Sequence, residues 1–322
     1  MSDNKKLDRL LSQLEKKYTA NKAKEFKAEK KMKTGIYGLD YVLDGGISQN
    51  IGGHVIELFG PESSCKSYFS LKVIEAYQKK DKVCVFIDGE NSYDSQWAEI
   101  CGVDNDKLIV IRPQSLEEMG DIVVKLLQED TDLIIIDSIV SFIPEDEIDR
   151  DTNQPTMALG ARINALISRK INKNMANKTS TMVFINQMRE KVGVMYGSPL
   201  TTGGGRALKH LYHTRIETRK GKPIDVGSGD KKERIGYEIH LKGVKNKKGT
   251  PYKAAIIDFY FNGSVDNTKS LFFSALRHNI IDLNGKTYTF GDKKVVGKDN
   301  MMKELTDKDW KEIEKELFKV SK

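Results

Sequence analysis

The chain has 322 residues, enough for one large domain or a core with a smaller satellite, because domains run roughly 100 to 200 residues. Hydrophobic residues make up 39% and charged residues 31%, which excludes an intrinsically disordered chain. No run approaches the roughly 20 apolar residues of a membrane span, and the three cysteines lack C-x-x-C spacing, so we expect a cytoplasmic protein without disulfides or a zinc knuckle. The net charge of +7 is compatible with a nucleic-acid partner but does not establish one.

The first 30 residues are rich in lysine and carry one apolar stripe. The residues at helical spacing are Leu7, Leu10, Leu11, Leu14 and Tyr18. A single helix must bury such a stripe, either against its own domain or against a neighbouring subunit, and the sequence leaves both open.

Between residues 35 and 260, short apolar runs alternate with helical patterns. Continuous apolar runs bounded by polar turns are typical of strands covered on both faces, and they occupy residues 54–59, 82–88, 107–111, 133–137 and 181–186. Helical periodicity falls between them, at residues 66–80, 115–129 and 157–175. This order predicts an α/β fold with a largely parallel sheet.

After residue 234 the pattern changes. Residues 234–261 predict an antiparallel extension of the sheet. A small α+β unit follows from about residue 264, and it is predicted to contain a helix at 269–281, a turn-rich hairpin at 283–297 and a closing helix at 307–320.

The segment "GPESSCKS" follows a predicted strand and opens a predicted helix, which is the context of a phosphate-binding loop. Backbone N–H groups of such a loop converge on phosphates, its lysine reaches the β/γ oxygens and the next hydroxyl ligates Mg²⁺. Cys65 stands where the pattern has glycine; its β-carbon costs roughly 1 to 2 kcal/mol if the backbone is left-handed, and only a steric cost if glycine is needed for room. The predicted nucleotide-binding residues are Gly60, Pro61, Glu62, Ser63, Ser64, Cys65, Lys66 and Ser67.

Acidic residues end two of the predicted strands. Asp137 closes "LIIID", and a carboxylate beside the loop can hold Mg²⁺ through water. Asp88 and Glu90 follow the strand after the loop's helix, at the sheet edge where ligands of open α/β sheets bind. A carboxylate there can activate the attacking water, although an acidic solvated loop explains the same residues.

Five motifs stand in a fixed order: "GPESSCKS", "FIDGENSYD", "LIIIDS", "FINQMREKVGVMYGSPLTTGGGRALK" and "VKNKKGTPYK". In this order they resemble the bacterial RecA recombinase family, from about residue 33 to the C-terminus. The resemblance implies an ATP-dependent filament that coats single-stranded DNA and drives homologous pairing and strand exchange. It also implies an oligomerisation helix and linker at 1–33, a RecA-type ATPase core with DNA-binding loops at 34–263 and a small α+β domain at 264–322.

The resemblance assigns roles around the nucleotide. Glu90 matches the catalytic glutamate, and Gln187 matches the glutamine that senses the γ-phosphate and relays it to a DNA loop. Lys245 and Lys247 match lysines that reach the ATP of the adjoining subunit, although the residues alone indicate only a solvated basic turn. Lys66 takes the catalytic lysine position. The residues that match the adenine contacts are Asp94, Trp97 and Phe261.

The family's two DNA loops also have counterparts. The first loop and the helix after it are matched by Met157, Arg162, Arg169 and Lys170. The second is a glycine-rich stretch of about 20 residues, which cannot form one regular element and is usually functional inside a compact domain, although a flexible surface loop is the alternative. It supplies cations, backbone amides and apolar side chains for phosphates and bases: Arg189, Lys191, Val194, Tyr196, Gly204, Gly205 and Arg206.

The chain departs from the family pattern at three places. Cys65 replaces a glycine, a position where phage recombinases of the family also tolerate a larger residue, so a phage-like or divergent member is favoured. A thiol beside Lys66 and a helix N-terminus is expected to have a lowered pKa. The C-terminus is basic where many bacterial members carry an acidic tail, and Pro155 stands where the first DNA loop has a glycine-bearing stretch. Because the rest of the site is intact, we expect a working ATPase.

Two other functions fit the same core. A hexameric helicase-like motor shares the nucleotide loop, and a DNA-coating module would bind ATP with little hydrolysis. The expected cofactors are ATP and Mg²⁺. The expected partners are single-stranded DNA, homologous duplex DNA and further copies of the chain, with single-strand-binding and mediator proteins as further candidates and no membrane.

Overall fold

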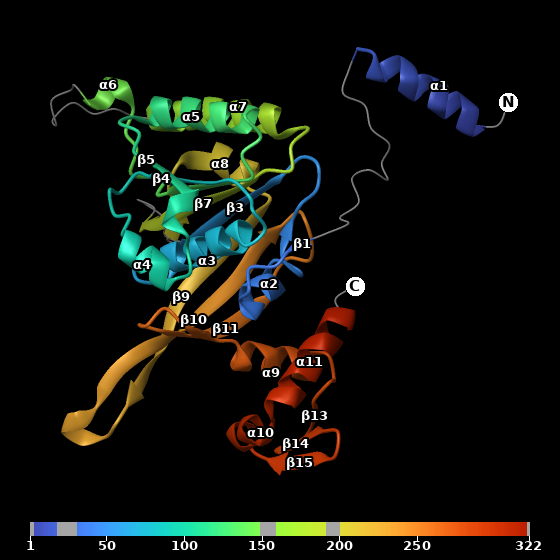
Figure 1. The fold of residues 1–322 in the computed structure, drawn as a ribbon, viewed down its shortest axis with the longest axis vertical. Helices are drawn as coiled ribbons and strands as arrows, with labels where there is room; N and C mark the ends of the chain where they lie inside the picture. The colour runs from blue at the N-terminus through green and yellow to red at the C-terminus, as the bar shows by residue number, and fades with distance from the viewer. Residues whose placement is uncertain (1–2, 18–30, 149–158, 191–199, 321–322) are drawn as a thin grey trace.

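The computed structural model of the chain describes residues 3–17, 31–148, 159–190 and 200–320. Its centre is a ten-stranded sheet in the order β12-β11-β10-β9-β3-β7-β6-β4-β5, with β8 paired to β7 (Figure 1). The strands from β9 to β5 along this order are parallel, whereas β10, β11 and β12 extend the sheet in antiparallel fashion. The predicted α/β fold with a largely parallel sheet is confirmed.

The central parallel strands β3, β4 and β6 are buried along their whole length, and β4 and β6 end in aspartate. In this sheet the strands are β3 His54–Gly60, β4 Cys84–Asp88, β5 Leu108–Ile111, β6 Leu133–Asp137, β7 Thr181–Glu190, β8 Leu200–Thr202, β9 Thr214–Val226, β10 Glu233–Asn246, β11 Ala254–Tyr260 and β12 Val265–Asp266. A separate pair joins β1 Lys31–Met32 to β2 Ile47–Ser48. Because β3, β4 and β6 are buried throughout, the loops at their carboxyl ends are held by a rigid frame.

Helices cover both faces of the sheet and bury one hydrophobic cluster on each. One face carries α2 Tyr37–Val42, α3 Lys66–Gln78 and α9 Thr268–Arg277. The opposite face carries α5 Leu116–Gln128, α7 Leu159–Met175 and α8 Gly205–Leu211. Shorter helices are α4 Ser95–Ile100, α6 Glu145–Ile148 and the 3-10 turns at Asn105–Lys107 and Gly229–Lys231.

The C-terminal unit follows the sheet directly. It comprises α9, a three-stranded sheet and two closing helices: β13 Asp282–Asn284, β14 Thr287–Phe290, β15 Lys293–Val296, α10 Lys298–Glu304 and α11 Asp307–Val320. The predicted helix, hairpin and closing helix are confirmed, whereas β13 and α10 were not foreseen. Ile313 and Leu317 of α11 join the same hydrophobic cluster as Ile257 of β11, so the unit shares a core with the sheet. The predicted boundary at residue 263 stays a prediction.

Two segments project from this core. The hairpin of β9 and β10 extends well beyond the other strands (Figure 1). Helix α1 spans Asp3–Glu15, and the side chains of Leu7 and Leu10 are 54% and 51% exposed. Among the described residues, no helix combines the length and the apolar character that crossing a membrane requires.

Candidate nucleotide and DNA sites

The predicted phosphate-binding loop connects β3 to α3. Lys66 starts the helix, and its Nζ donates to the carbonyl oxygens of Gly60 at 3.2 Å and Pro61 at 2.7 Å. Burial lowers the pKa of Lys66, and the charges of Asp137 and Glu90 oppose that shift. A buried ammonium that closes the loop on its own carbonyls is placed to exchange those oxygens for phosphate oxygens.

The backbone settles why the family has glycine at residue 65. Cys65 has φ 63° and ψ 24°, so the position is left-handed, and the β-carbon costs roughly 1 to 2 kcal/mol. The sequence had left a purely steric reason open. Burial raises the pKa of Cys65 to about 12, although the charges of Lys220 and Lys66 oppose it, so the expectation of a lowered thiol pKa is wrong. Desolvation of the thiolate exceeds the attraction of the nearby cations.

The predicted metal ligands lie together. Ser67 Oγ donates to Asp137 Oδ2 at 2.7 Å, which brings a hydroxyl and a carboxylate from α3 and β6 to one point. Burial raises the pKa of Asp137 to about 6; the hydrogen bond from Ser67 opposes the shift and the charge of Glu90 adds to it. These are hard oxygen donors of the kind that Mg²⁺ prefers.

The two acids after β4 have different surroundings. The carboxylate of Asp88 is fully buried and accepts from Arg112 Nε at 3.0 Å and from two backbone N–H groups, so it holds the loop in place. Glu90 Oε1 instead accepts from Ser138 Oγ at 2.5 Å and from Gln187 Nε2 at 2.9 Å. The structure thus joins the two residues predicted to activate water and to sense the γ-phosphate.

A pocket of about 420 Å³ opens beside the loop. Trp97 and Phe261, the two aromatic residues expected to contact adenine, both line it. Asp94 does not line it; its Oδ1 caps α4 by accepting from the backbone N–H groups of Gln96 and Trp97. Motif matching missed four further lining residues, namely Tyr68, Lys220, Tyr237 and Phe259. In the sequence, only the alternation of side chains between the two faces of β9, β10 and β11 could have indicated which residues face the pocket.

The two lysines expected to act on a neighbouring subunit lie away from this pocket. Lys245 Nζ donates to the carbonyl oxygen of Lys209 at 2.6 Å, and burial lowers its pKa to about 8. Lys247 follows β10 and lines a separate pocket of about 360 Å³ with Arg169, His210 and His213. Neither lysine belongs to the lining of its own chain's nucleotide pocket.

The predicted DNA-binding residues fall into three groups. Arg162, Arg169 and Arg206 are exposed on α7 and α8, which pack on the same face of the sheet. Lys170 pairs with Asp121 of α5 at 2.9 Å. Outside the described residues lie Met157, Lys191, Val194 and Tyr196, and the side chain of Arg189 is likewise not described.

The second DNA loop is shorter than predicted, because regular structure enters it from both sides. β7 continues to Glu190, and Met188 and Arg189 pair with Thr202 and Thr201 of β8. Helix α8 then begins at Gly205, and both Gly205 and the residue before it, Gly204, are left-handed, with φ 86° and 83°. The expectation that the whole stretch is irregular is therefore wrong. The pairing of β7 with β8 fixes the two points at which the chain between Glu190 and Leu200 is attached to the sheet.

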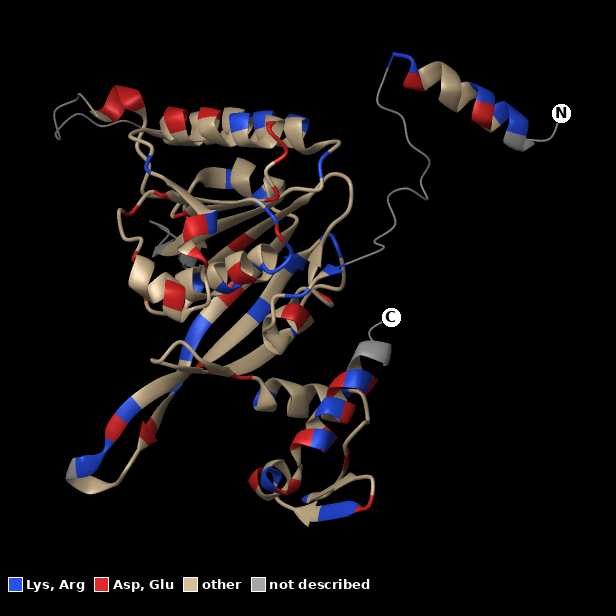
Figure 2. Ribbon diagram, viewed as in Figure 1, with Lys and Arg blue, Asp and Glu red and all other residues tan. Residues whose placement is uncertain are grey.

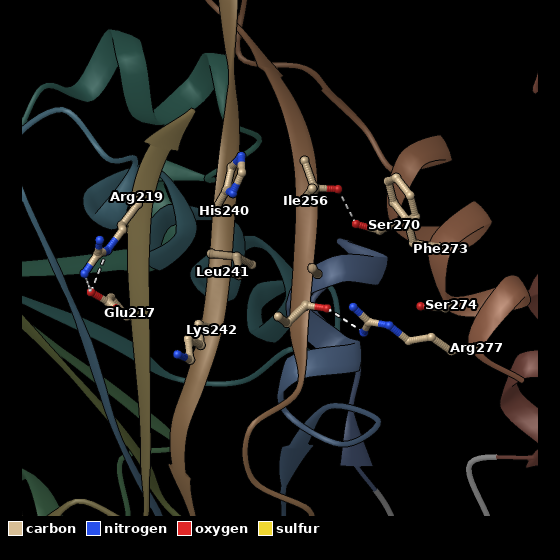
Figure 3. Close-up of a pocket in the computed structure, with 12 residues that line it drawn as sticks. Glu217, Arg219, His240, Leu241, Lys242, Ile256, Ser270, Phe273, Ser274 and Arg277 are labelled. Atoms are coloured by element: carbon tan, nitrogen blue, oxygen red, sulfur yellow. Dashed lines mark hydrogen bonds and ion pairs between the residues drawn. The ribbon is translucent and has the colours of Figure 1, made fainter. Parts of the chain in front are cut away.

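A second pocket, of about 520 Å³, is lined by residues of α9 and of β9, β10 and β11 (Figure 3). Its basic lining residues are Arg219, His240, Lys242 and Arg277. The lining also includes one acidic residue, Glu217, whose Oε1 forms an ion pair with Arg219 at 2.5 Å. Figure 2 shows basic residues recurring along β9 and its hairpin with β10. No motif had indicated this basic surface.

Comparison with known proteins points to one family. A family model described as the RecA N-terminal domain matches residues 5–266. The chain is 37% identical over 263 residues to Protein RecA of Lactococcus lactis subsp. cremoris, covering 81% of this chain and 67% of that protein. It is 37% identical over 312 residues to Protein RecA of Streptococcus gordonii, covering 94% and 80%. It is 34% identical over 337 residues to Protein RecA of Acholeplasma laidlawii, covering 100% of this chain and 100% of that protein.

Proposed function

The chain belongs to the RecA family and is a recombinase with DNA-dependent ATPase activity, and on that premise we propose where its ATP is bound and cleaved. The observation that carries the proposal is the convergence of Lys66, Ser67, Glu90, Asp137 and Gln187 at the carboxyl ends of β3, β4, β6 and β7. Ligands of open α/β sheets bind at this edge.

The oxygen donors of the site fit Mg²⁺. Ser67 would ligate the ion directly and Asp137 through water, since their oxygens already lie 2.7 Å apart. When bound, Mg²⁺ neutralises charge on the β- and γ-phosphates. Lys66 would turn from the loop carbonyls to the same oxygens. The loop amides from Ser63 to Ser67 and the N-terminus of α3 supply the remaining positive potential.

Glu90 is the proposed residue that orients and activates the attacking water. Its carboxylate is held by Ser138 and Gln187, so it has a fixed direction before nucleotide arrives. Gln187 lies on β7, the strand that continues to Glu190 and into the second DNA loop. A γ-phosphate that draws the Gln187 amide away from Glu90 would therefore shift the strand that carries the loop. This is a direct route from nucleotide to DNA.

Self-association of the family gives Lys245 and Lys247 their proposed role. Both lie outside the pocket of their own chain, and both carry charge that lacks a carboxylate partner among the described residues. In a helical filament they would meet the ATP of the adjoining subunit and stabilise the developing charge in trans. Each active site would then be complete only in the assembly.

Two surfaces fit the two DNA molecules of a recombination reaction. The arginines of α7 and α8, with the left-handed glycines at the start of α8, form the proposed surface for single-stranded DNA: Arg162, Arg169, Arg206, Gly204 and Gly205. We propose that the basic pocket under α9 (Figure 3) takes part in holding the homologous duplex. Single-strand-binding and mediator proteins, and action in the cytoplasm where bacterial DNA resides, remain proposals.

Salt dependence of DNA binding tests the single-strand surface. Replacing Arg162 and Arg206 by alanine should flatten the slope of log affinity against log salt by roughly 1.4, because each phosphate contact on a single strand contributes about 0.7 to the slope. Lys170→Ala is the matched control; since Lys170 pairs with Asp121, its slope should change less. An unchanged slope in the double variant would place the DNA elsewhere.

Electron micrographs with ATP and single-stranded DNA should show helical filaments, whereas closed rings would favour the helicase-like motor.

A further inference from the structure

One wall of the nucleotide pocket comes from residues that no motif supplies. The loop and α3 contribute part of the lining, as do Trp97 and Phe261, the residues expected to contact adenine. The remaining wall is made by Lys220 of β9 and Tyr237 of β10, together with Phe259. Lys220 therefore places a positive charge in the wall of a pocket that is proposed to hold a polyphosphate.

Strand geometry directs Lys220 towards the loop. Thr218 Oγ1 lies 2.7 Å from Ser64 Oγ, which fixes the face of β9 that contacts the loop. Side chains two residues apart share a face, so Lys220 is on this face. Glu217 and Arg219 are on the other face and line the basic pocket (Figure 3). One strand therefore contributes to both pockets.

An irregularity in the strand pairing lies directly beside Lys220. Tyr237 pairs with Pro223, but Ile239 pairs with Lys220, so β9 has two residues where β10 has one. Such bulges re-aim side chains and are frequent next to active sites. Gly221 occupies the bulge, and a β-carbon there would lie 2.5 Å from His240 Nε2. A larger side chain at residue 221 would therefore require the His240 imidazole to move.

The ammonium of Lys220 is held by an aromatic ring. Its Nζ lies 3.6 Å from the ring centroid of Tyr237, whose hydroxyl accepts from Arg234 Nη1 at 3.2 Å. Within the described part of the chain, no carboxylate forms an ion pair with Lys220. Among the charges that oppose burial at the Cys65 thiol, Lys220 has the largest effect on its pKa, which places the ammonium close to the loop.

We propose that Lys220 binds the polyphosphate of the nucleotide within its own subunit, from the strand side of the loop, and that Tyr237 holds it in place until nucleotide arrives. The proposal rests on the nucleotide site at residues 60–67. Charge-assisted hydrogen bonds to phosphate are stronger than the attraction of a cation to an aromatic ring, so bound phosphate draws the ammonium away from Tyr237. The flexible lysine stem permits the move.

Titration calorimetry of the full chain with MgADP, without DNA, tests the proposal. Lys220→Ala should weaken binding about tenfold, the loss expected for one charge-assisted hydrogen bond, and Lys220→Arg should keep most of the affinity. Lys222→Ala is the matched control: it removes an exposed lysine of the same strand that does not line the pocket, and it should bind as the parent does. Parental affinity in Lys220→Ala would overturn the proposal.

Two further measurements separate this proposal from the site on which it rests. If Lys66→Ala binds MgADP like the parent, the nucleotide site itself is wrong; if only Lys66→Ala loses affinity, the role of Lys220 alone is wrong. Iodoacetamide reports on Cys65, since Cys84 and Cys101 are buried. Alkylation should be slower in Lys220→Ala than in Lys222→Ala, because the nearby charge favours the thiolate. Equal rates would show that Lys220 does not approach the loop.

Discussion

At the scale of single residues, Cys65 combines a left-handed backbone with a buried thiol. Cys65→Gly removes the β-carbon from that conformation while Lys66 and Ser67 stay in place. We expect ATP to be hydrolysed at least as fast, with a gain bounded by roughly 1 to 2 kcal/mol, or about tenfold, from the relieved strain. Steady-state phosphate release measures this. A variant much slower than the parent would show that the surrounding loop is adapted to cysteine.

Asp137 gives the site a pH dependence that can be measured without nucleotide. Burial raises its pKa to about 6, above the value of about 3.9 for an unfolded aspartate. Between about pH 4 and 6 the native chain therefore holds a proton that the unfolded chain has lost, and this group lowers the free energy of unfolding as pH rises through that window. Relative to Asp137→Asn, the parent should lose melting temperature from pH 4 to 6 and then level off. A constant difference would mean that Asp137 is ionised throughout.

The sequence predicted much of this site because its chemistry depends on motif order. Ser67 of α3 meets Asp137 of β6, and Glu90, in the loop after β4, meets Gln187 of β7. Side-chain surroundings were not predictable in the same way. Asp88 stands two residues before Glu90, but only the fold shows that Arg112 neutralises it. The predicted pKa of the Cys65 thiol was wrong for a similar reason, since a motif does not show how deeply a side chain is buried.

At the scale of elements, buried strands were the most predictable parts. Continuous apolar runs located β3, β4, β5, β6 and β7 within one or two residues at most ends. β9 was missed because "TRIETRKGKPIDV" alternates charge with apolar residues and projects from the body. The bulge beside Lys220 depends on pairing with β10, a long-range property that no local pattern carries. That is why the second wall of the nucleotide pocket escaped prediction.

Helix α1 should dock on the next subunit, because its leucine stripe is exposed. The open edge of the sheet, β5, offers an apolar surface at Ile109, which is 54% exposed, and at Val110. Deleting residues 1–30, or replacing Leu7 and Leu10 together by serine, should leave a folded chain that no longer polymerises. Light scattering with ATP and single-stranded DNA measures this, with Lys5 and Lys6 replaced by serine as the control. Filaments of normal length from the leucine variant would count against docking.

At the scale of the whole molecule, strands β9, β10 and β11 separate two functional surfaces. One face lines the nucleotide pocket and the other lines the basic pocket under α9 (Figure 3). β7 meanwhile joins Gln187 to the second DNA loop. A nucleotide bound in this pocket would therefore be connected to both proposed DNA surfaces through single strands. Such rigid elements carry coupling only if both ligands bias the same pair of conformations.

The most direct test of the account is phosphate release measured against single-stranded DNA for the parent and for Glu90→Gln. Hydrolysis by the parent should be low without DNA and rise with it, because Gln187 links the nucleotide to the DNA loop and Lys245 and Lys247 arrive only from a neighbour. Glu90→Gln should form the same filaments with almost no turnover, since the amide cannot accept the proton of the attacking water. Hydrolysis that ignores DNA, or parental turnover in Glu90→Gln, would contradict it.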